Sequence, residues 1–240
     1  MITENVNGGI FIRFDSPVVL SDDAKKRLLE KWDMANEEGE VDDLLLEAEK
    51  IADPKAYIKP ADVEEIGDGY VVMNGIRFRS VLLADKLSPM HASGEKVYFH
   101  LATCGMELHE WAVNNDDILL RGVSEDICLE YLGIASAAVR SYAAENFFKG
   151  HHFSSMNPGS LAAWNIRGQI PTFELFGEGA EKCGVTLGES MLMTPFKSGS
   201  GVYFSTEHDF ESCMFCDKLD CPNRRAEYMM QYETPAEEES

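Results

Sequence analysis

Three cysteines lie close together near the end of the chain, at Cys213, Cys216 and Cys221. The spacing Cys-x2-Cys-x4-Cys gathers three soft sulfur ligands in a short stretch, which is typical of a zinc ion or an iron–sulfur cluster. A disulfide interpretation leaves one odd thiol, and secreted disulfide scaffolds are shorter chains that are richer in cysteine. The spacing therefore predicts a metal site. An iron–sulfur cluster is favoured, zinc is the alternative, and plain thiols are the third interpretation.

A fourth ligand must come from elsewhere in the chain. The other three cysteines are scattered, and an isolated cysteine is usually a small buried apolar residue. Cys104 differs from them because the apolar run 97–102 precedes it and Gly105 follows it, so a strand is expected to end there. Cys104 is therefore the first choice for the fourth ligand. His208, just before the cluster, is the second.

Composition limits the function classes. The 240 residues, 45% of them hydrophobic, are enough for one large domain or two small ones with a proper core. Lys and Arg total 21 against 42 Asp and Glu, a net charge of −21. Such a charge repels nucleic acid and anionic membranes, so neither is an expected partner. The first residues lack the pattern of a signal peptide and no apolar stretch is long enough to span a bilayer, so we expect a cytoplasmic protein.

The first secondary-structure elements that the sequence predicts are helices. Ser21 can cap a helix and Asp22 and Asp23 suit its first turn, so the helical pattern begins there and runs to about residue 50. A second helix is predicted over about 42–52. After them, a strand is expected over 97–103, a short helix over 107–113, and a long helix whose apolar residues recur at helical spacing between 127 and 142.

A hairpin is predicted in the middle of the chain. Asn74-Gly75 separates the strand-like segments 70–73 and 76–79. This dipeptide suits a two-residue turn because both central positions need positive φ.

A second hairpin is predicted from the segments 185–193 and 198–205, which flank a short turn-like stretch. Between the two hairpins, residues 150–160 are polar and turn-forming, which predicts a loop. His151 and His152 lie in it and could ligate a metal or titrate, although adjacent histidines in a loop are more often solvated. We expect both hairpins to belong to a curved, mainly antiparallel sheet.

The domain organisation follows from these elements. We expect an N-terminal helical segment over 1–60, a core over 61–208, a cysteine cluster segment over 209–228 and an acidic, disordered tail over 229–240.

Several motifs together resemble the activation domain of cobalamin-dependent methionine synthase, in its stand-alone form with an added cysteine cluster. They are Leu101-Ala-Thr-Cys-Gly105, Glu107-Leu-His-Glu-Trp111, Gly133-Ile-Ala-Ser-Ala-Ala-Val139, Asn157-Pro-Gly159, Gly184-Val-Thr-Leu-Gly-Glu-Ser-Met-Leu-Met-Thr-Pro195 and Ser198-Gly-Ser-Gly-Val-Tyr-Phe204. Their order and spacing follow the family from about residue 70 to residue 204. The first 60 residues match it only as leading helices.

The resemblance implies an α/β (α+β) fold, a C-shaped domain with a twisted, mainly antiparallel sheet and flanking helices. In the family this domain binds S-adenosylmethionine and presents the methyl donor to a cobalamin whose cobalt has been oxidised. Carried over by position, the cofactor-binding residues are Asn157, Pro158, Gly159, Ser160 and Glu189. No catalytic residue is assigned.

The ligand loop departs from the family pattern Arg-x-x-x-Gly-Tyr. With Pro158-Gly159 aligned, Ser155 stands where the arginine belongs and Ser160 where the tyrosine belongs. Serine cannot replace the bidentate contact of arginine with a carboxylate. The sequence therefore predicts weak binding of S-adenosylmethionine.

These observations favour an accessory protein that acts on a corrinoid (cobalamin) methyl-transfer protein and supports its reductive reactivation. Iron–sulfur clusters reach roughly −700 mV, low enough to supply the electron for Co(II) reduction. Two alternatives stay open. One is a methyltransferase component of methionine or one-carbon metabolism that binds S-adenosylmethionine through the loop backbone. The other is a non-catalytic binding module with a structural zinc.

Overall fold

A computed structural model describes residues 1–34, 36–207, 210–220 and 226–229. The helices are α1 (Asp22–Trp32), α2 (Glu38–Ile51), α3 (Val81–Ser93), α4 (Met106–Val113), α5 (Ile118–Ala143), α6 (Gln169–Phe176) and α7 (Glu178–Cys183), with short helical turns η1 (Ala144–Phe148), η2 (Ile166–Gly168) and η3 (Ser212–Phe215). The strands are β1 (Ile2–Val6), β2 (Gly9–Arg13), β3 (Lys55–Ala61), β4 (Val63–Gly67), β5 (Tyr70–Met73), β6 (Ile76–Arg79), β7 (Val97–Thr103), β8 (Phe153–Met156), β9 (Thr186–Leu187), β10 (Met193–Thr194) and β11 (Ser198–Ser205).

The strands form three sheets. One has six strands in the order β1-β2-β3-β7-β11-β8, one has three in the order β4-β5-β6, and β9 pairs with β10. The strand pairs β1–β2, β4–β5, β5–β6, β8–β11 and β9–β10 are antiparallel. Antiparallel strands with flanking helices confirm the predicted α/β fold class. None of the helices in the described ranges is long and apolar enough to cross a membrane.

The chain divides into two compact units, and each is built from three separate segments. Unit 1 comprises 1–57, 101–141 and 178–199, and unit 2 comprises 58–100, 142–177 and 200–240.

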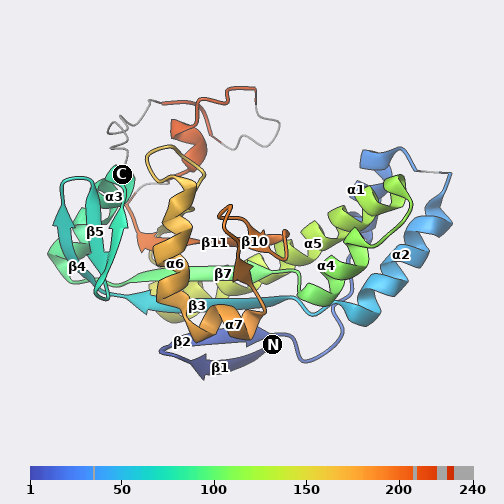
Figure 1. Cartoon of the computed structure of the whole chain (residues 1–240), viewed down its shortest axis with the longest axis horizontal. Coiled ribbons are helices and arrows are strands. Elements are labelled where there is room, and N and C mark those ends of the chain that lie inside the picture. Colours follow the sequence, from blue (N-terminus) through green and yellow to red (C-terminus); the bar gives the residue numbers. More distant parts are fainter. Residues whose placement is uncertain (35, 208–209, 221–225, 230–240) are drawn as a thin grey trace. The chain divides into compact units, whose positions relative to one another are not determined.

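Unit 1 contains a helical layer in which α1, α2, α4 and α5 lie side by side (Figure 1). As predicted, α1 begins after Ser21, whose side-chain oxygen accepts a hydrogen bond from the backbone N–H of Ala24 at 3.3 Å. At the other end of α1, the Trp32 indole N–H donates to Asp126 of α5 at 2.8 Å. Buried side chains from all four helices fill the space between them: Leu28, Val41, Leu44, Leu108, Val123, Ile127 and Tyr131, together with Met34 from the segment between α1 and α2.

Tyr131 makes the stability of this core depend on pH. Its hydroxyl donates to the carbonyl of Val18 at 2.9 Å, and burial raises the pKa of Tyr131 to about 12. An unfolded tyrosine has a pKa of about 10, so between these values the unfolded state loses a proton that the folded state keeps. The free energy of unfolding therefore falls as pH rises through this window.

The urea midpoint of the wild type should fall as the pH is raised from about 9 to about 11.5, a range that contains most of the interval between the two pKa values. The midpoint of Tyr131→Phe should fall less over about the same range. The exposed Tyr228 provides the matched control, because Tyr228→Phe should keep the wild-type pH dependence. The same fall in all three proteins would contradict the assignment.

Unit 1 also contains a hairpin in the segment that the sequence predicts to be helical. β1 and β2 pair from Ile2↔Arg13 to Val6↔Gly9. The turn residues Asn7 and Gly8 have φ values of 47° and 76°, as a two-residue turn requires. The expectation of helices alone before residue 60 is therefore wrong at its start.

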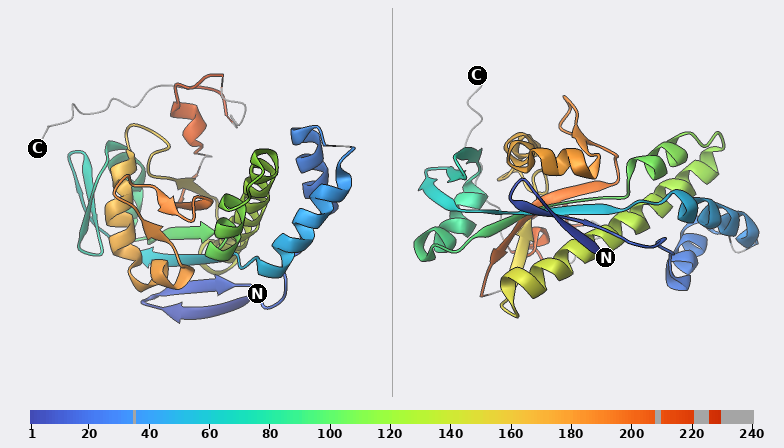
Figure 2. Two further views of the ribbon diagram at one scale, coloured as in Figure 1. Left: turned by 45° about the vertical axis from the view of Figure 1, so that its right-hand side comes forward. Right: turned by 90° about the horizontal axis from the view of Figure 1, so that it is seen from below.

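Unit 2 contains the three-stranded sheet, with α3 and α6 lying against it (Figure 2). The predicted hairpin is confirmed: β5 and β6 pair from Tyr70↔Arg79 to Met73↔Ile76. Asn74 and Gly75 at its tip have φ values of 49° and 77°. The hairpin belongs to this small sheet, however, and not to the six-stranded sheet.

Two other expectations require correction. The segments 185–193 and 198–205 do not pair with each other: β9 pairs with β10, whereas β11 lies between β7 and β8 in the larger sheet. Part of the predicted loop 150–160 is the strand β8, which pairs with β11 from Met156↔Val202 to Phe153↔Ser205. In both cases β11 pairs with a strand that is distant in sequence, which a local pattern does not predict.

Candidate functional site

The predicted ligand loop begins where β8 ends, in unit 2. The backbone N–H of Gly159 donates to the carbonyl of Trp164 at 2.8 Å, and that of Ser160 donates to the carbonyl of Asn157 at 3.2 Å. Gly159 has a φ of 83°, a conformation that glycine adopts without a steric penalty. The segment 157–164, the ligand loop from here on, thus folds back on itself and leaves Gly159 and Ser160 exposed.

A polar network ties the ligand loop to β11 and α6. The side-chain amide of Asn157 donates to the carbonyl of Ser200 at 2.6 Å, and the buried hydroxyl of Ser200 donates to Gln169 at 2.8 Å. Gly201 follows directly, where a Cβ atom would lie 2.5 Å from the Asn157 amide nitrogen and 2.5 Å from the carbonyl oxygen of Met156. The loop therefore requires glycine at 201, a constraint that no local sequence pattern indicates.

The two departures from the family pattern occupy different environments. Ser155 lies in β8 opposite Tyr203 and is partly buried, whereas Ser160 is exposed on the ligand loop. Pro158 between them is buried. Neither serine carries a positive charge. Neither can therefore form an ion pair with the carboxylate of S-adenosylmethionine.

Glu189 belongs to unit 1. It is exposed in the turn between β9 and β10, which is closed by a hydrogen bond of 2.9 Å from the Gly188 N–H to the Leu192 carbonyl. The structure thus assigns the predicted cofactor-binding residues to two units: Glu189 to unit 1 and residues 157–160 to unit 2.

Cys213 and Cys216 lie at the short turn η3 in unit 2, and both are partly buried. Aromatic packing fixes the segment that carries them. Phe210 stacks on Phe215 with ring centroids 5.5 Å apart, and the Lys86 ammonium lies 5.7 Å from each of these ring centroids. The Phe210 N–H donates to the Ser154 hydroxyl of β8 at 2.9 Å.

Cys213 lies within η3 and Cys216 directly follows it, so the two candidate sulfur ligands belong to one short segment. Cys221 and His208, the other candidates near the cluster, lie outside the described residues. Within the described ranges, no group of three potential metal ligands is brought together. The metal site of Cys213, Cys216 and Cys221 therefore stays a prediction.

Cys104, predicted as the fourth ligand, follows β7 in unit 1 as expected, but its side chain is fully buried in the helical core. There its thiol donates to the carbonyl of Gly105 at 3.4 Å, and the thiol of Cys128 from α5 donates to the carbonyl of Leu108 at 3.5 Å. The interaction with Cys128 lowers the pKa of Cys104, and the interaction with Cys104 together with burial raises the pKa of Cys128. The sequence indicated neither this interaction nor a role for Cys128 beyond the core.

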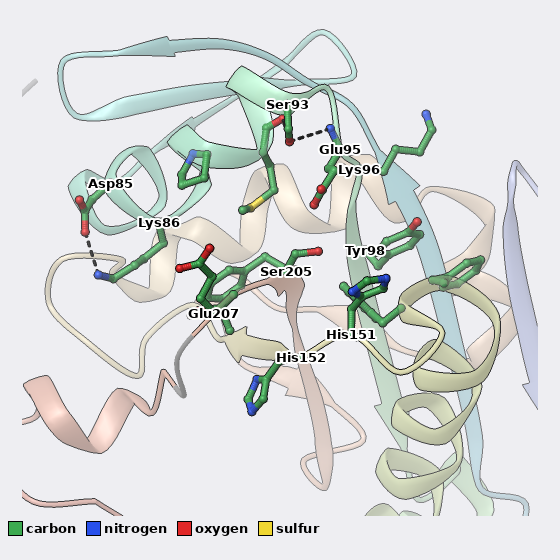
Figure 3. A pocket seen from close by; sticks show the side chains of 16 residues that line it. Asp85, Lys86, Ser93, Glu95, Lys96, Tyr98, His151, His152, Ser205 and Glu207 are labelled. Atoms are coloured by element: carbon green, nitrogen blue, oxygen red, sulfur yellow. Dashed lines mark hydrogen bonds and ion pairs between the residues drawn. The ribbon is translucent and has the colours of Figure 1, made fainter.

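Unit 2 has an open pocket of 1190 Å³ that the sequence patterns did not indicate (Figure 3). Met90, Phe148 and Phe204 are buried residues of its lining, and His151 and His152 line it from the segment after η1. The lining comes from α3, β7, η1 and the end of β11, so no local spacing could reveal it. A lining that combines apolar and charged residues suits a small molecule that has an apolar body and polar substituents.

The tyrosine of this pocket belongs to a row of aromatic contacts. Tyr98 stacks on Phe147 at 4.3 Å and meets the edge of Phe148 at 5.3 Å. Phe148 in turn stacks on Phe153 of β8 at 4.2 Å. These ring contacts connect the pocket wall to β8 through continuous aromatic packing.

Comparisons with known proteins find similarity at the level of structure. No family model and no curated protein matches the chain. Among solved structures, the chain is similar to the crystal structure of the MetH reactivation domain bound to AdoHcy, S-adenosylhomocysteine, with a TM-score of 0.54. The two chains are 18% identical, and the match covers 78% of this chain and 67% of the other. At this identity the similarity establishes the fold, and it supports the resemblance seen in the sequence.

Proposed function

We propose that this protein is an accessory protein that acts on a corrinoid methyl-transfer protein and supports its reductive reactivation. The observation that carries the proposal is the similarity of fold to the MetH reactivation domain over 78% of the chain. Three further features support it: a ligand loop held by its own hydrogen bonds, an added cysteine segment, and a charge that favours a basic partner surface.

The chemistry of reactivation requires one electron and one methyl group. An electron converts Co(II) to Co(I), which then attacks the methyl carbon of S-adenosylmethionine, and the products are methyl–Co(III) and S-adenosylhomocysteine. For this reaction the chain would bind the sulfonium donor at the ligand loop and shield it from water. The loop can do so with backbone groups, because the exposed Gly159 allows close approach.

The test uses the cobalamin-binding domain of a methionine synthase, loaded with cob(II)alamin, as the probe. With S-adenosylmethionine and a low-potential chemical reductant, we expect the full chain to accelerate the appearance of the methylcob(III)alamin spectrum. The acceleration should decrease as salt is raised, because charge complementarity steers the encounter. An unchanged rate, with or without the chain, would contradict the function.

Cys213, Cys216 and Cys221 would hold the metal in this proposal, and the turn that carries the first two fits such a group. A bound iron–sulfur cluster would supply low-potential electrons. Zinc in the same place would fix the segment without electron transfer. Cys104 is not included, because its side chain is fully buried in the helical core and its thiol donates to the carbonyl of Gly105.

Ligand affinity is the most direct readout of the loop. Wild-type binding of S-adenosylmethionine should be weak, because the loop lacks an arginine at position 155. A charge-assisted bidentate contact contributes about 2 kcal/mol, or roughly thirtyfold in affinity. Ser155→Arg should therefore strengthen binding by about thirtyfold in calorimetry.

Ser88→Arg is the matched control for this experiment. Ser88 is exposed on α3 in the same unit, so the change adds the same charge away from the ligand loop. Equal gains in both variants would show that net charge, rather than a contact at 155, raises the affinity. Tight wild-type binding would show that the ligand uses other residues.

A further inference from the structure

The open pocket of unit 2 lies at the opposite end of two strands from the ligand loop. Strands β8 and β11 are paired, and Met156, which leads into the ligand loop, stands opposite Val202. At the other end of the same pair, Phe153 stands opposite Ser205, which lines the pocket. All residues of the lining belong to unit 2, and a volume of 1190 Å³ is large enough for a small organic molecule. The pocket is therefore a candidate binding site separate from the ligand loop.

An unusual backbone shapes one wall of this pocket. Helix α5 continues into the π-helical turn η1, whose last residues, Phe147 and Phe148, line the pocket. Lys149 then has a φ of 48°, which is uncommon for a residue with a Cβ atom, and Gly150 has a φ of 88°. Directly after this bend, His151 lines the same pocket. Both π-helical turns and left-handed residues other than glycine are frequent at functional sites.

The two lysines that line the pocket already have acidic partners. The ammonium of Lys86 lies 3.0 Å from the carboxylate of Asp85. The ammonium of Lys96 lies 2.6 Å from the carboxylate of Asp62. An anionic ligand would therefore have to compete with these carboxylates for both positive charges.

Two glutamates leave negative charge in the same lining. Glu95 follows α3 and Glu207 follows β11, and both side chains are exposed. Figure 3 shows them entering the pocket from these two segments. In the part of the chain that the structure describes, neither carboxylate forms an ion pair. A cation in the pocket would supply the charge that both lack.

Aromatic rings complete this environment. The half-buried rings of Tyr98 and Phe147 belong to the lining and stack on each other at 4.3 Å. The faces of aromatic rings attract cations, and quaternary ammonium groups are recognised in proteins by such rings. Carboxylates and aromatic rings in one pocket thus favour a ligand that is both positively charged and apolar.

We propose that the pocket of unit 2 is a binding site for a small organic cation, in which a quaternary ammonium group carries an apolar chain. Glu95 and Glu207 neutralise the positive charge, while Tyr98 and Phe147 offer ring surface to the methyl groups and the chain. An anion of the same shape is rejected, because it would face the two carboxylates. Binding is non-covalent and leaves the ligand unchanged.

The experiment measures binding to the full-length protein by calorimetry. The probe is hexyltrimethylammonium, and hexanesulfonate is the matched compound with the same chain and the opposite charge. We expect saturable binding of the ammonium compound and no binding of the sulfonate. No binding of the ammonium compound, or equal binding of both compounds, would overturn the proposal.

Paired variants separate the pocket from the general negative charge of the chain. Glu95→Gln combined with Glu207→Gln should lower the affinity for the ammonium probe about tenfold. Asp68→Asn combined with Glu174→Gln is the matched control, because both residues are exposed in unit 2 and lie outside the pocket lining. This control should bind as the wild type does. An equal loss in both double variants would show that net charge alone attracts the probe, and the proposal would be wrong.

The aromatic contribution has its own pair of variants. Tyr98→Leu should lower the affinity about fivefold, because it removes the ring. Tyr98→Phe keeps the ring and should bind as the wild type does. Wild-type affinity in Tyr98→Leu would contradict the assigned role of the ring. The proposed function does not enter these tests, because neither a corrinoid nor S-adenosylmethionine is present.

Discussion

Gly201→Ala is expected to destabilise unit 2 by about 3 kcal/mol and to remove ligand binding by the loop. A Cβ atom at this position would lie 2.5 Å from the Asn157 amide nitrogen, 2.5 Å from the Met156 carbonyl oxygen and 2.8 Å from the His100 ring. Two of these three atoms are backbone or hydrogen-bonded, so they cannot simply rotate away. Relief of the clash requires breaking the bond of 2.6 Å between Asn157 and the Ser200 carbonyl.

Gly199→Ala is the matched control, because it lies two residues away on the same strand and its Cβ atom would meet nothing within 4 Å. Urea unfolding and calorimetry with S-adenosylhomocysteine measure the two effects. The prediction fails if both variants unfold at the same urea concentration. If Gly201→Ala is destabilised but binds S-adenosylhomocysteine with unchanged affinity, the predicted steric clash is confirmed. The ligand loop is then not the site of binding.

Cys216→Ser is expected to abolish metal binding, the largest functional effect predicted for this chain. Cys213 and Cys216 lie on one turn, and the loss of either leaves too few sulfur ligands near the other. Wild-type protein reconstituted anaerobically with iron and sulfide should show a visible absorption from sulfur-to-iron charge transfer. The variant should remain colourless and contain no stoichiometric metal.

Cys183→Ser controls for a general loss of thiols, since Cys183 is buried in unit 1 and has no place in the cysteine segment. It should retain the wild-type absorption. Colourless wild-type protein with one bound zinc, lost in Cys216→Ser, would favour the structural role over electron transfer. Wild-type protein that binds neither metal would remove the metal site.

The two hairpins with Asn-Gly turns show what the sequence can and cannot reveal. Asn74-Gly75 lies between apolar strands and was recognised, whereas Asn7-Gly8 has the same turn chemistry and was missed. The difference lies in β1, an edge strand with side chains almost fully exposed, so that no alternation marks it. A turn signal is therefore informative even where the flanking hydrophobic pattern is weak.

The candidate sites also contain some features that the local sequence predicts and others that depend on residues distant in the chain. Cys213 and Cys216 are identified as candidate ligands by their spacing alone, and both lie at the turn η3. Cys104 and Cys128 share one core because helices distant in sequence pack together, and strand β8 is stable because β11, some 45 residues later in the chain, pairs with it. Such partners are set by tertiary packing, which overrides local propensity.

Both units are discontinuous, and this has a consequence for biosynthesis. Unit 1 needs residues 178–199 and unit 2 needs residues from 200 onward. Each unit therefore stays incomplete until most of the chain has emerged from the ribosome. The nascent protein cannot fold one unit after the other, as multidomain chains commonly do during translation. Ribosome-bound intermediates shorter than about 200 residues should expose apolar surface and engage chaperones, and a premature stop before that point would leave neither unit able to fold.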